Sequence, residues 1–186
     1  ELRQDEQLRF VAKEPLDLIF MDLKILAKGS KGRIHEASLN ILDAYTGASR
    51  TYRLTKHDTP AIRACLVHFA GHRAARYIVR GHSDNAGEIT KACDELGWIC
   101  EPSAANRPVH NPFAERNIQT VTMGAKCSIL QSNLRVGRFW ADAEAHFITS
   151  LFFFTPSRCN PEKTKSEALT KLTFEGHRFP SGCLMH

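Results

Sequence analysis

Three acidic residues stand where a predicted strand ends or a predicted helix begins, which is where sites gather in open α/β sheets. Asp22 ends an apolar strand, Asp84 follows another predicted strand through a short loop, and Glu115 lies in the first turns of a long helix. If these side chains meet, they carry a charge of about −3 and repel one another unless cations bind between them. Two Mg²⁺ or Mn²⁺ ions, roughly 3.5–4 Å apart, would balance that charge and activate a water or a DNA 3′-hydroxyl for in-line phosphoryl transfer.

The helix that carries Glu115 also has a polar side. Gln119, Thr122 and Lys126 follow Glu115 at spacings of four, seven and eleven, so the four side chains share one helix face. The residues of this region that could contact DNA phosphates are Asn85, Arg107, His110, Arg116, Gln119 and Lys126. The alternative is a set of turn residues and a solvated helix face, with three carboxylates that are ordinary surface charges among the 20 acidic residues.

The elements that must position these residues are predicted from hydrophobic periodicity and from turn residues. Strands are predicted over 16–21, 38–42, 50–54, 76–80 and 98–101, and helices over 60–70, 87–96, 138–153 and from Pro112 onward. Thr59 is the expected N-cap of the first helix and Gly71 its end, whereas Gly81 to Asn85 is expected to be a loop. The first three strands form an antiparallel meander, and the whole order predicts a mixed α/β sheet covered by helices.

Composition favours one globular domain that binds an acidic partner. The chain has 186 residues, of which 42% are hydrophobic and 24% charged, and its net charge is +5. The longest apolar run, 147–154, is too short to span a bilayer, so no membrane partner is expected. We expect a lead-in over 1–14, a core over 15–155 and a loop-rich extension of the core over 156–186. The chain opens on Glu1, which suggests a fragment of a longer protein.

Two segments around the acidic residues resemble the integrase catalytic cores of retroviruses and retrotransposons. Residues 82–88, HSDNAGE, resemble the segment S-D-N-G-x-E-F of that family, and residues 111–117, NPFAERN, resemble its segment N-G-x-A-E-R-x-N. Residues 139–143, FWADA, are similar to the F-W-x-E-A helix of copia-type elements in particular. Pro112 replaces the usual glycine of the second segment, and Ala86 displaces the first glycine of the first.

This resemblance implies a ribonuclease H-like fold, with a five-stranded mixed sheet flanked by helices. It places Asp22, Asp84 and Glu115 at the positions of the family's DDE metal ligands. The implied activities are Mg²⁺-dependent 3′-end processing of element DNA and its strand transfer into target DNA. The implied partners are both DNAs and further copies of the chain, in a cytoplasmic particle as part of a polyprotein and then in the nucleus.

Two other functions fit the same residues. A ribonuclease H-like nuclease would use the same carboxylates to cut DNA or an RNA–DNA hybrid without joining it. A catalytically inactive, DNA-binding remnant of a retrotransposon polyprotein would not bring the carboxylates together or would bind no divalent metal.

Several further residues have a structural interpretation beside a functional one. Asp43 is expected to cap a turn rather than to bind a metal. A zinc site on one helix face would use Cys65, His68 and His72, but no fourth ligand is evident and a partly buried face is the alternative. Cys93 and Cys100 are expected to be core thiols, and the three phenylalanines 152–154 are expected in the core or an oligomer interface.

Overall fold

The computed structural model describes residues 11–25, 36–71, 74, 79–83, 86–102, 112–133 and 136–176. For residues 102, 112–114 and 136–138 only the backbone is described. Most of the lead-in over 1–14, the beginning of the fourth predicted strand and the end of the 156–186 extension therefore lie outside the described residues.

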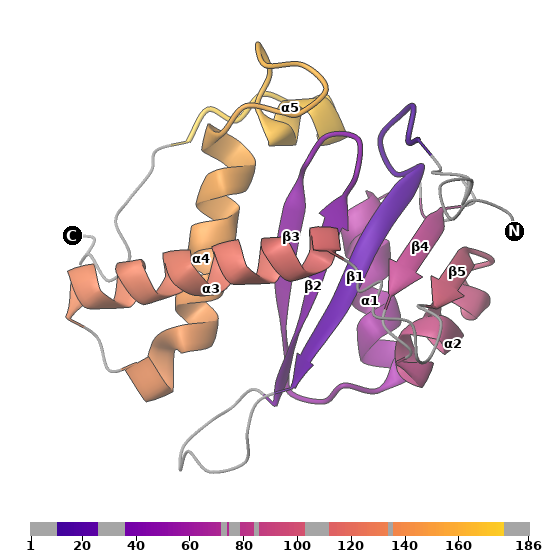
Figure 1. Cartoon of the computed structure of the whole chain (residues 1–186), viewed down its shortest axis with the longest axis horizontal. Coiled ribbons are helices and arrows are strands. Elements are labelled where there is room, and N and C mark those ends of the chain that lie inside the picture. Colours follow the sequence, from indigo (N-terminus) through magenta and orange to yellow (C-terminus); the bar gives the residue numbers. More distant parts are fainter. Residues whose placement is uncertain are drawn as a thin grey trace, which may run out of the picture.

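One five-stranded sheet forms the centre of the molecule, with the strand order β3-β2-β1-β4-β5 (Figure 1). The strands are β1 (Leu18–Ile25), β2 (Ala37–Asp43), β3 (Ser49–Leu54), β4 (Arg80–Ser83) and β5 (Ile99–Pro102). β1, β2 and β3 pair antiparallel as the predicted meander, whereas β4 lies parallel to β1 and β5 parallel to β4. The predicted mixed five-stranded α/β fold is confirmed.

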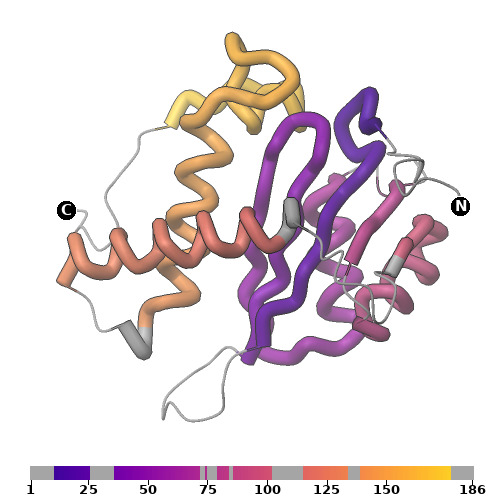
Figure 2. Tube along the Cα trace, in the orientation of Figure 1, coloured from indigo at the N-terminus to yellow at the C-terminus, as the bar shows by residue number. Residues whose placement is uncertain are grey.

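Helices cover both faces of this sheet (Figure 1). They are α1 (Thr59–Ala70), α2 (Gly87–Glu95), α3 (Pro112–Ser132), α4 (Val136–Phe154) and the short α5 (Lys165–Thr170). α1 and α2 pack on one face, whereas α3 crosses the other face over β1 and β2 and α4 packs beside β3. Figure 2 follows the same path as a tube and shows that the segment before α5 returns to the β2–β3 turn.

Alternation along β1 assigns its side chains to these two layers. Ile19 and Met21 are fully buried and belong to the core cluster that includes Ile62 of α1 and Ile89 of α2. Phe20 between them, and Asp22 after Met21, point to the opposite face because successive strand side chains alternate. That opposite face is the one covered by α3 and α4.

Two strand boundaries differ from the predicted ones in a way that bears on the site. β1 continues past Asp22 to Ile25, because its ladder with β2 runs on to the pair Ile25↔Ala37. Asp22 therefore lies inside the strand rather than at its end. The predicted loop from Gly81 is also wrong, since β4 includes Gly81 and ends at Ser83. A Cβ on Gly81 would lie 2.5 Å from Met21 Cε, so the end of the Met21 side chain would have to move to admit a larger residue there.

Capping residues explain two further differences. Asp58, not Thr59, is the N-cap of α1, and its Oδ1 accepts a hydrogen bond from the Ala61 amide at 3.1 Å. Gly71 ends α1 at φ 60°, as predicted. The C-terminal segment, predicted to be loop-like, contains α5, which begins with a capping box between Thr164 and Glu167. A helix of six residues is too short to show periodicity in the sequence.

Within the described ranges, no helix is both long and apolar enough to cross a membrane.

Candidate active site

Asp22 and the end of β4, the strand that precedes Asp84 in the sequence, belong to neighbouring parallel strands. Asp22 is half-buried in β1 and pairs with Asn40 of β2. Asp84 lies outside the described residues, but Ser83, the last residue of β4, pairs with Met21. The chain therefore leaves β4 at the level at which Asp22 follows Met21 on the adjacent strand.

Glu115 reaches the same face of the sheet through α3. It lies in the first turn of that helix, and its side chain is exposed. Further along α3, the hydroxyl of Thr122 accepts a hydrogen bond from Lys24 Nζ of β1 at 3.2 Å. Seven residues advance an α-helix by almost two turns, so Glu115 and Thr122 share one side of α3. Because Lys24 and Asp22 are two residues apart in β1, they point to the same face, which is the face that α3 covers.

A buried ion pair holds the two helices of this face on β1. Lys24 Nζ lies 2.8 Å from Glu144 Oε1 of α4, and Glu144 is only 1% exposed. The same ammonium group lies 4.7 Å from the centre of the Trp140 ring. Burial raises the pKa of Glu144, although its hydrogen bonds to Lys24 and Thr122 lower it. These contacts fix the position of α3 relative to Asp22.

The other edge of α3 is attached to β3. Asn117 donates from Nδ2 to Ser49 Oγ at 2.9 Å. Since Asn117 and Thr122 lie on different edges of the helix, α3 is held against β3 on one side and β1 on the other. Val121, Ala125 and Ile129 follow one another at spacings of four, and this apolar stripe of α3 is buried.

No family model and no curated protein sequence matches the chain, but solved structures do. A chain of the simian T-cell lymphotropic virus intasome, in complex with the PP2A regulatory subunit B56 gamma, matches with a TM-score of 0.62 and 14% identity. That match covers 84% of this chain and 55% of the intasome chain. The HTLV-2 integrase catalytic core domain, in complex with magnesium and in a trimeric form, has a TM-score of 0.58 and 15% identity over 85% of this chain and 99% of its own.

The catalytic core domain of BIV integrase matches with a TM-score of 0.53 and 16% identity, covering 84% of this chain and 95% of its own. The chain has the fold of a retroviral integrase catalytic core. The predicted ribonuclease H-like class is thereby confirmed, and the chain spans nearly all of an isolated core domain but about half of the longer intasome chain.

In this integrase-core fold, the residues predicted to contact DNA are found on different surfaces. Gln119 and Lys126 are exposed on the side of α3 that carries Glu115. Arg116 is exposed as well but lines a recess with Asn117. The predicted residues Asn85, Arg107 and His110 lie outside the described residues.

Asp43 has the structural role predicted for it. The carboxylate is fully buried and accepts hydrogen bonds from the Leu16 amide at 2.8 Å, from the Thr46 amide at 2.8 Å and from the Thr46 hydroxyl at 2.6 Å. Burial raises the pKa of Asp43, and these donors lower it. Two of these donors belong to Thr46, so Asp43 closes the β2–β3 turn.

The helical zinc site receives no support from the described residues. His68 Nδ1 lies 2.9 Å from the Tyr52 hydroxyl, and His72 is outside the described part. No group of three His, Cys, Asp or Glu side chains among the described residues could hold a metal ion, and Asp84 is not one of those residues. Phe152 is buried in the core as predicted, while Phe153 stacks on Phe174.

Two residues that position α3 were not predicted from the sequence. Neither Lys24 nor Glu144 is among the predicted site residues. The available signal is a single glutamate in the helical sequence ADAEA, where Ala141 and Ala143 are buried too. An acidic residue in a buried stripe needs a cationic partner, but the sequence does not say which lysine or arginine supplies it.

Two thiols lie next to β4, one on the helix α2 and one on the neighbouring strand β5. Cys93 of α2 is buried as predicted, and Cys100 of β5 is half-buried with its Sγ 3.6 Å from Ser83 Oγ. The hydrogen bond between the two thiols lowers the pKa of Cys100 and raises that of Cys93. Burial raises the pKa of a third thiol, Cys65, to about 11.

We therefore expect the pH dependence of alkylation to differ between these cysteines. The thiolate is the reactive form, so Cys100 will reach half-maximal reaction with iodoacetamide at a lower pH in the native protein than in the unfolded chain. Cys65 will show the opposite shift, toward about 11. Peptide mapping by mass spectrometry separates the sites. A native midpoint for Cys100 above its unfolded midpoint would contradict the thiol–thiol hydrogen bond.

Proposed function

We propose that the chain is the catalytic core of a DNA integrase that processes the 3′ ends of element DNA and joins them to target DNA. The observation that carries the proposal is the arrangement of three elements. β1 and β4 run parallel, so the chain leaves β4 beside Asp22, and α3 brings the side that carries Glu115 over the same face of the sheet. The integrase-core fold supports the same assignment.

The donor set suits a hard divalent cation, because carboxylate oxygens are preferred by Mg²⁺ and Mn²⁺. The HTLV-2 core domain is a magnesium complex. In this chain Asp22, Asp84 and Glu115 would hold two such ions, which supply activation of the attacking oxygen and stabilisation of the leaving oxygen. Asp22 contributes a ligand from a strand paired on both sides, and Glu115 contributes one from a helix anchored to β1 through Thr122 and to β3 through Asn117. Such rigid elements hold ligands accurately.

The wider context is part of the proposal. The likeness of segment 139–143 to copia-type elements supports a retrotransposon origin, with action on chromosomal DNA in the nucleus. The trimeric form of the HTLV-2 core domain and the intasome match support assembly of several copies on DNA. The net charge of +5 favours contact with phosphates rather than with base edges, so target preference is expected to be weak.

A joining assay tests the function. The full chain is incubated with short duplexes of randomised terminal sequence, a supercoiled plasmid and Mg²⁺ or Mn²⁺, and the plasmid is then sequenced for joined ends. We expect joined products with either ion and none with EDTA. Plasmid cleavage without joining would instead identify a nuclease, and binding of DNA without any reaction would identify an inactive remnant.

A further inference from the structure

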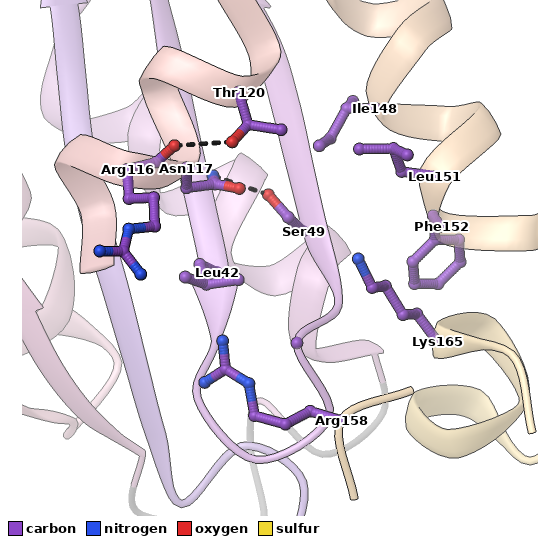
Figure 3. A pocket seen from close by; sticks show the side chains of 11 residues that line it. Leu42, Ser49, Arg116, Asn117, Thr120, Ile148, Leu151, Phe152, Arg158 and Lys165 are labelled. Atoms are coloured by element: carbon purple, nitrogen blue, oxygen red, sulfur yellow. Dashed lines mark hydrogen bonds between the residues drawn. The ribbon is translucent and has the colours of Figure 1, made fainter. Parts of the chain in front are cut away.

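A recess outside the carboxylate site opens between the β2–β3 turn, the first turns of α3, α4 and the beginning of α5 (Figure 3). Its volume is about 200 Å³. Apolar side chains of β2 and α4 line it together with Ser49, Arg116, Asn117, Arg158 and Lys165. The lining therefore combines apolar side chains with polar and basic ones.

Three cations of this recess have no acidic partner in the part of the chain that the structure describes. Across the described ranges, no carboxylate lies within ion-pair distance of Arg116, Arg158 or Lys165. Asp43, in the same turn, uses its carboxylate for Leu16 and Thr46. A positive potential with no internal counter-charge attracts an anion from solution.

The β2–β3 turn contacts two of these cations, Arg158 and Lys165. The Arg158 amide donates to Thr46 O at 2.9 Å, and Arg158 Nη1 donates to Ala44 O at 3.2 Å. Gly47 has a φ of +71°, and a Cβ there would lie 3.6 Å from Arg158 Cβ and 3.8 Å from Lys165 Cε. Both basic side chains thus pack over the glycine. Burial and the nearby Arg158 lower the pKa of Lys165, a cost that a bound anion would relieve.

The polar groups of the recess suit phosphate oxygens. Arginine pairs with phosphate through two parallel N–H groups. The hydroxyl of Ser49 accepts from Asn117, so its own hydrogen can be donated to a ligand. The aromatic ring in the lining, Phe152, is only 3% exposed and offers no face on which a base could stack. These features favour a backbone phosphate over a nucleobase.

We propose that this recess binds a phosphate of the DNA backbone. Arg116, which lines it, directly follows Glu115 on α3, so a strand anchored there runs next to the carboxylate site. The inference rests on the proposed function because that function makes DNA the polyanion that reaches this surface. Arg158 and Lys165 are the residues that distinguish the recess from the α3 surface.

DNA affinity measured without metal tests the recess independently of the reaction. Fluorescence anisotropy with a labelled duplex in EDTA gives the Kd at several salt concentrations. For Arg158→Ala/Lys165→Ala we expect affinity to fall about tenfold or more, and the slope of log K against log salt to decrease by about 0.9, because one phosphate contact is lost. The matched control is Lys56→Ala/Lys91→Ala, which removes two exposed cations elsewhere and should change neither quantity appreciably.

A competition experiment and a single variant distinguish phosphate binding in the recess from other causes of weaker DNA binding. Sodium phosphate at constant ionic strength should compete with DNA for the wild-type chain more than for the double variant. Arg158→Gln alone, which changes an exposed side chain, keeps the test available if the double variant unfolds. An unchanged salt slope in Arg158→Gln or the double variant, or no DNA binding by the wild type, would overturn the inference. A wild-type chain that binds DNA through these residues but joins no ends would contradict the proposed joining reaction. The same result would support phosphate binding in the recess.

Discussion

Asp22→Asn is expected to abolish DNA joining while leaving the fold in place. Asparagine has nearly the shape of aspartate, and the strand pairing of Asp22 with Asn40 uses backbone groups. The substitution removes one negative charge from the set that would hold the metal ions. Losing several kcal/mol of charge stabilisation corresponds to a decrease in rate of about a thousandfold or more. Quantitative sequencing of joined ends measures this effect, and thermal unfolding verifies the fold.

Matched variants make this result specific. Asp94→Asn removes an exposed carboxylate from α2 and should join DNA at the wild-type rate. Glu115→Gln should behave like Asp22→Asn, because its carboxylate is assigned to the same metal pair. Joining that survives Asp22→Asn would place the reaction elsewhere in the chain. If Glu115→Gln joins DNA and Asp22→Asn does not, Glu115 of α3 is not a metal ligand, whereas Asp22 of β1 still is.

The second large effect is expected on stability, from the ion pair beneath α3 and α4. Glu144→Leu leaves the ammonium of Lys24 without its carboxylate in a largely buried position. Removing one partner of a buried pair costs about 3–5 kcal/mol, and the 30% exposure of the Lys24 side chain reduces this to about 2–3 kcal/mol, since the ammonium can turn toward water. Urea unfolding followed by circular dichroism measures the loss.

A double variant separates the pair from the packing. Lys24→Met/Glu144→Leu removes both charges together, and replacing a buried ion pair by apolar residues is often neutral or stabilising. We expect it to recover most of the stability that Glu144→Leu loses, which is a strongly non-additive cycle. If the stability losses of Lys24→Met and Glu144→Leu simply add in the double variant, the two charges do not stabilise each other. The double variant should still join DNA more slowly, because Thr122 no longer receives the Lys24 hydrogen bond that fixes α3.

Hydrophobic spacing was enough to predict the order of the strands and of the helices as far as α4. The stripe that includes Val121, Ala125 and Ile129 repeats every three or four residues, and all three are buried. Gly71 and Gly97 end helical segments at positive φ, where a side chain is unfavourable. Helical spacing and a glycine at the end of a helix each depend on residues that are close together in the sequence. They can therefore be recognised without knowledge of the fold.

Strand boundaries near the candidate site were less predictable because pairing partners set them. An aspartate after an apolar run looks like the end of a strand, yet β1 continues because β2 offers partners as far as Ala37. Gly81 resembles a loop residue, yet it sits in a strand because it pairs with Ile19 of β1 and Cys100 of β5. In both cases contacts with a distant segment override the local preference.

By itself, the sequence determined a mixed α/β fold, the amphipathic face of α3 and the carboxylate types that suit divalent metal ions. Only the tertiary structure decided which side of the sheet receives Glu115, and which cation compensates Glu144. Lys24 and Glu144 are 120 residues apart in the chain, and Arg158 bonds to Ala44 across 114 residues. Periodicity describes which face of an element is apolar, but only packing in three dimensions selects the partner that meets each polar group on it.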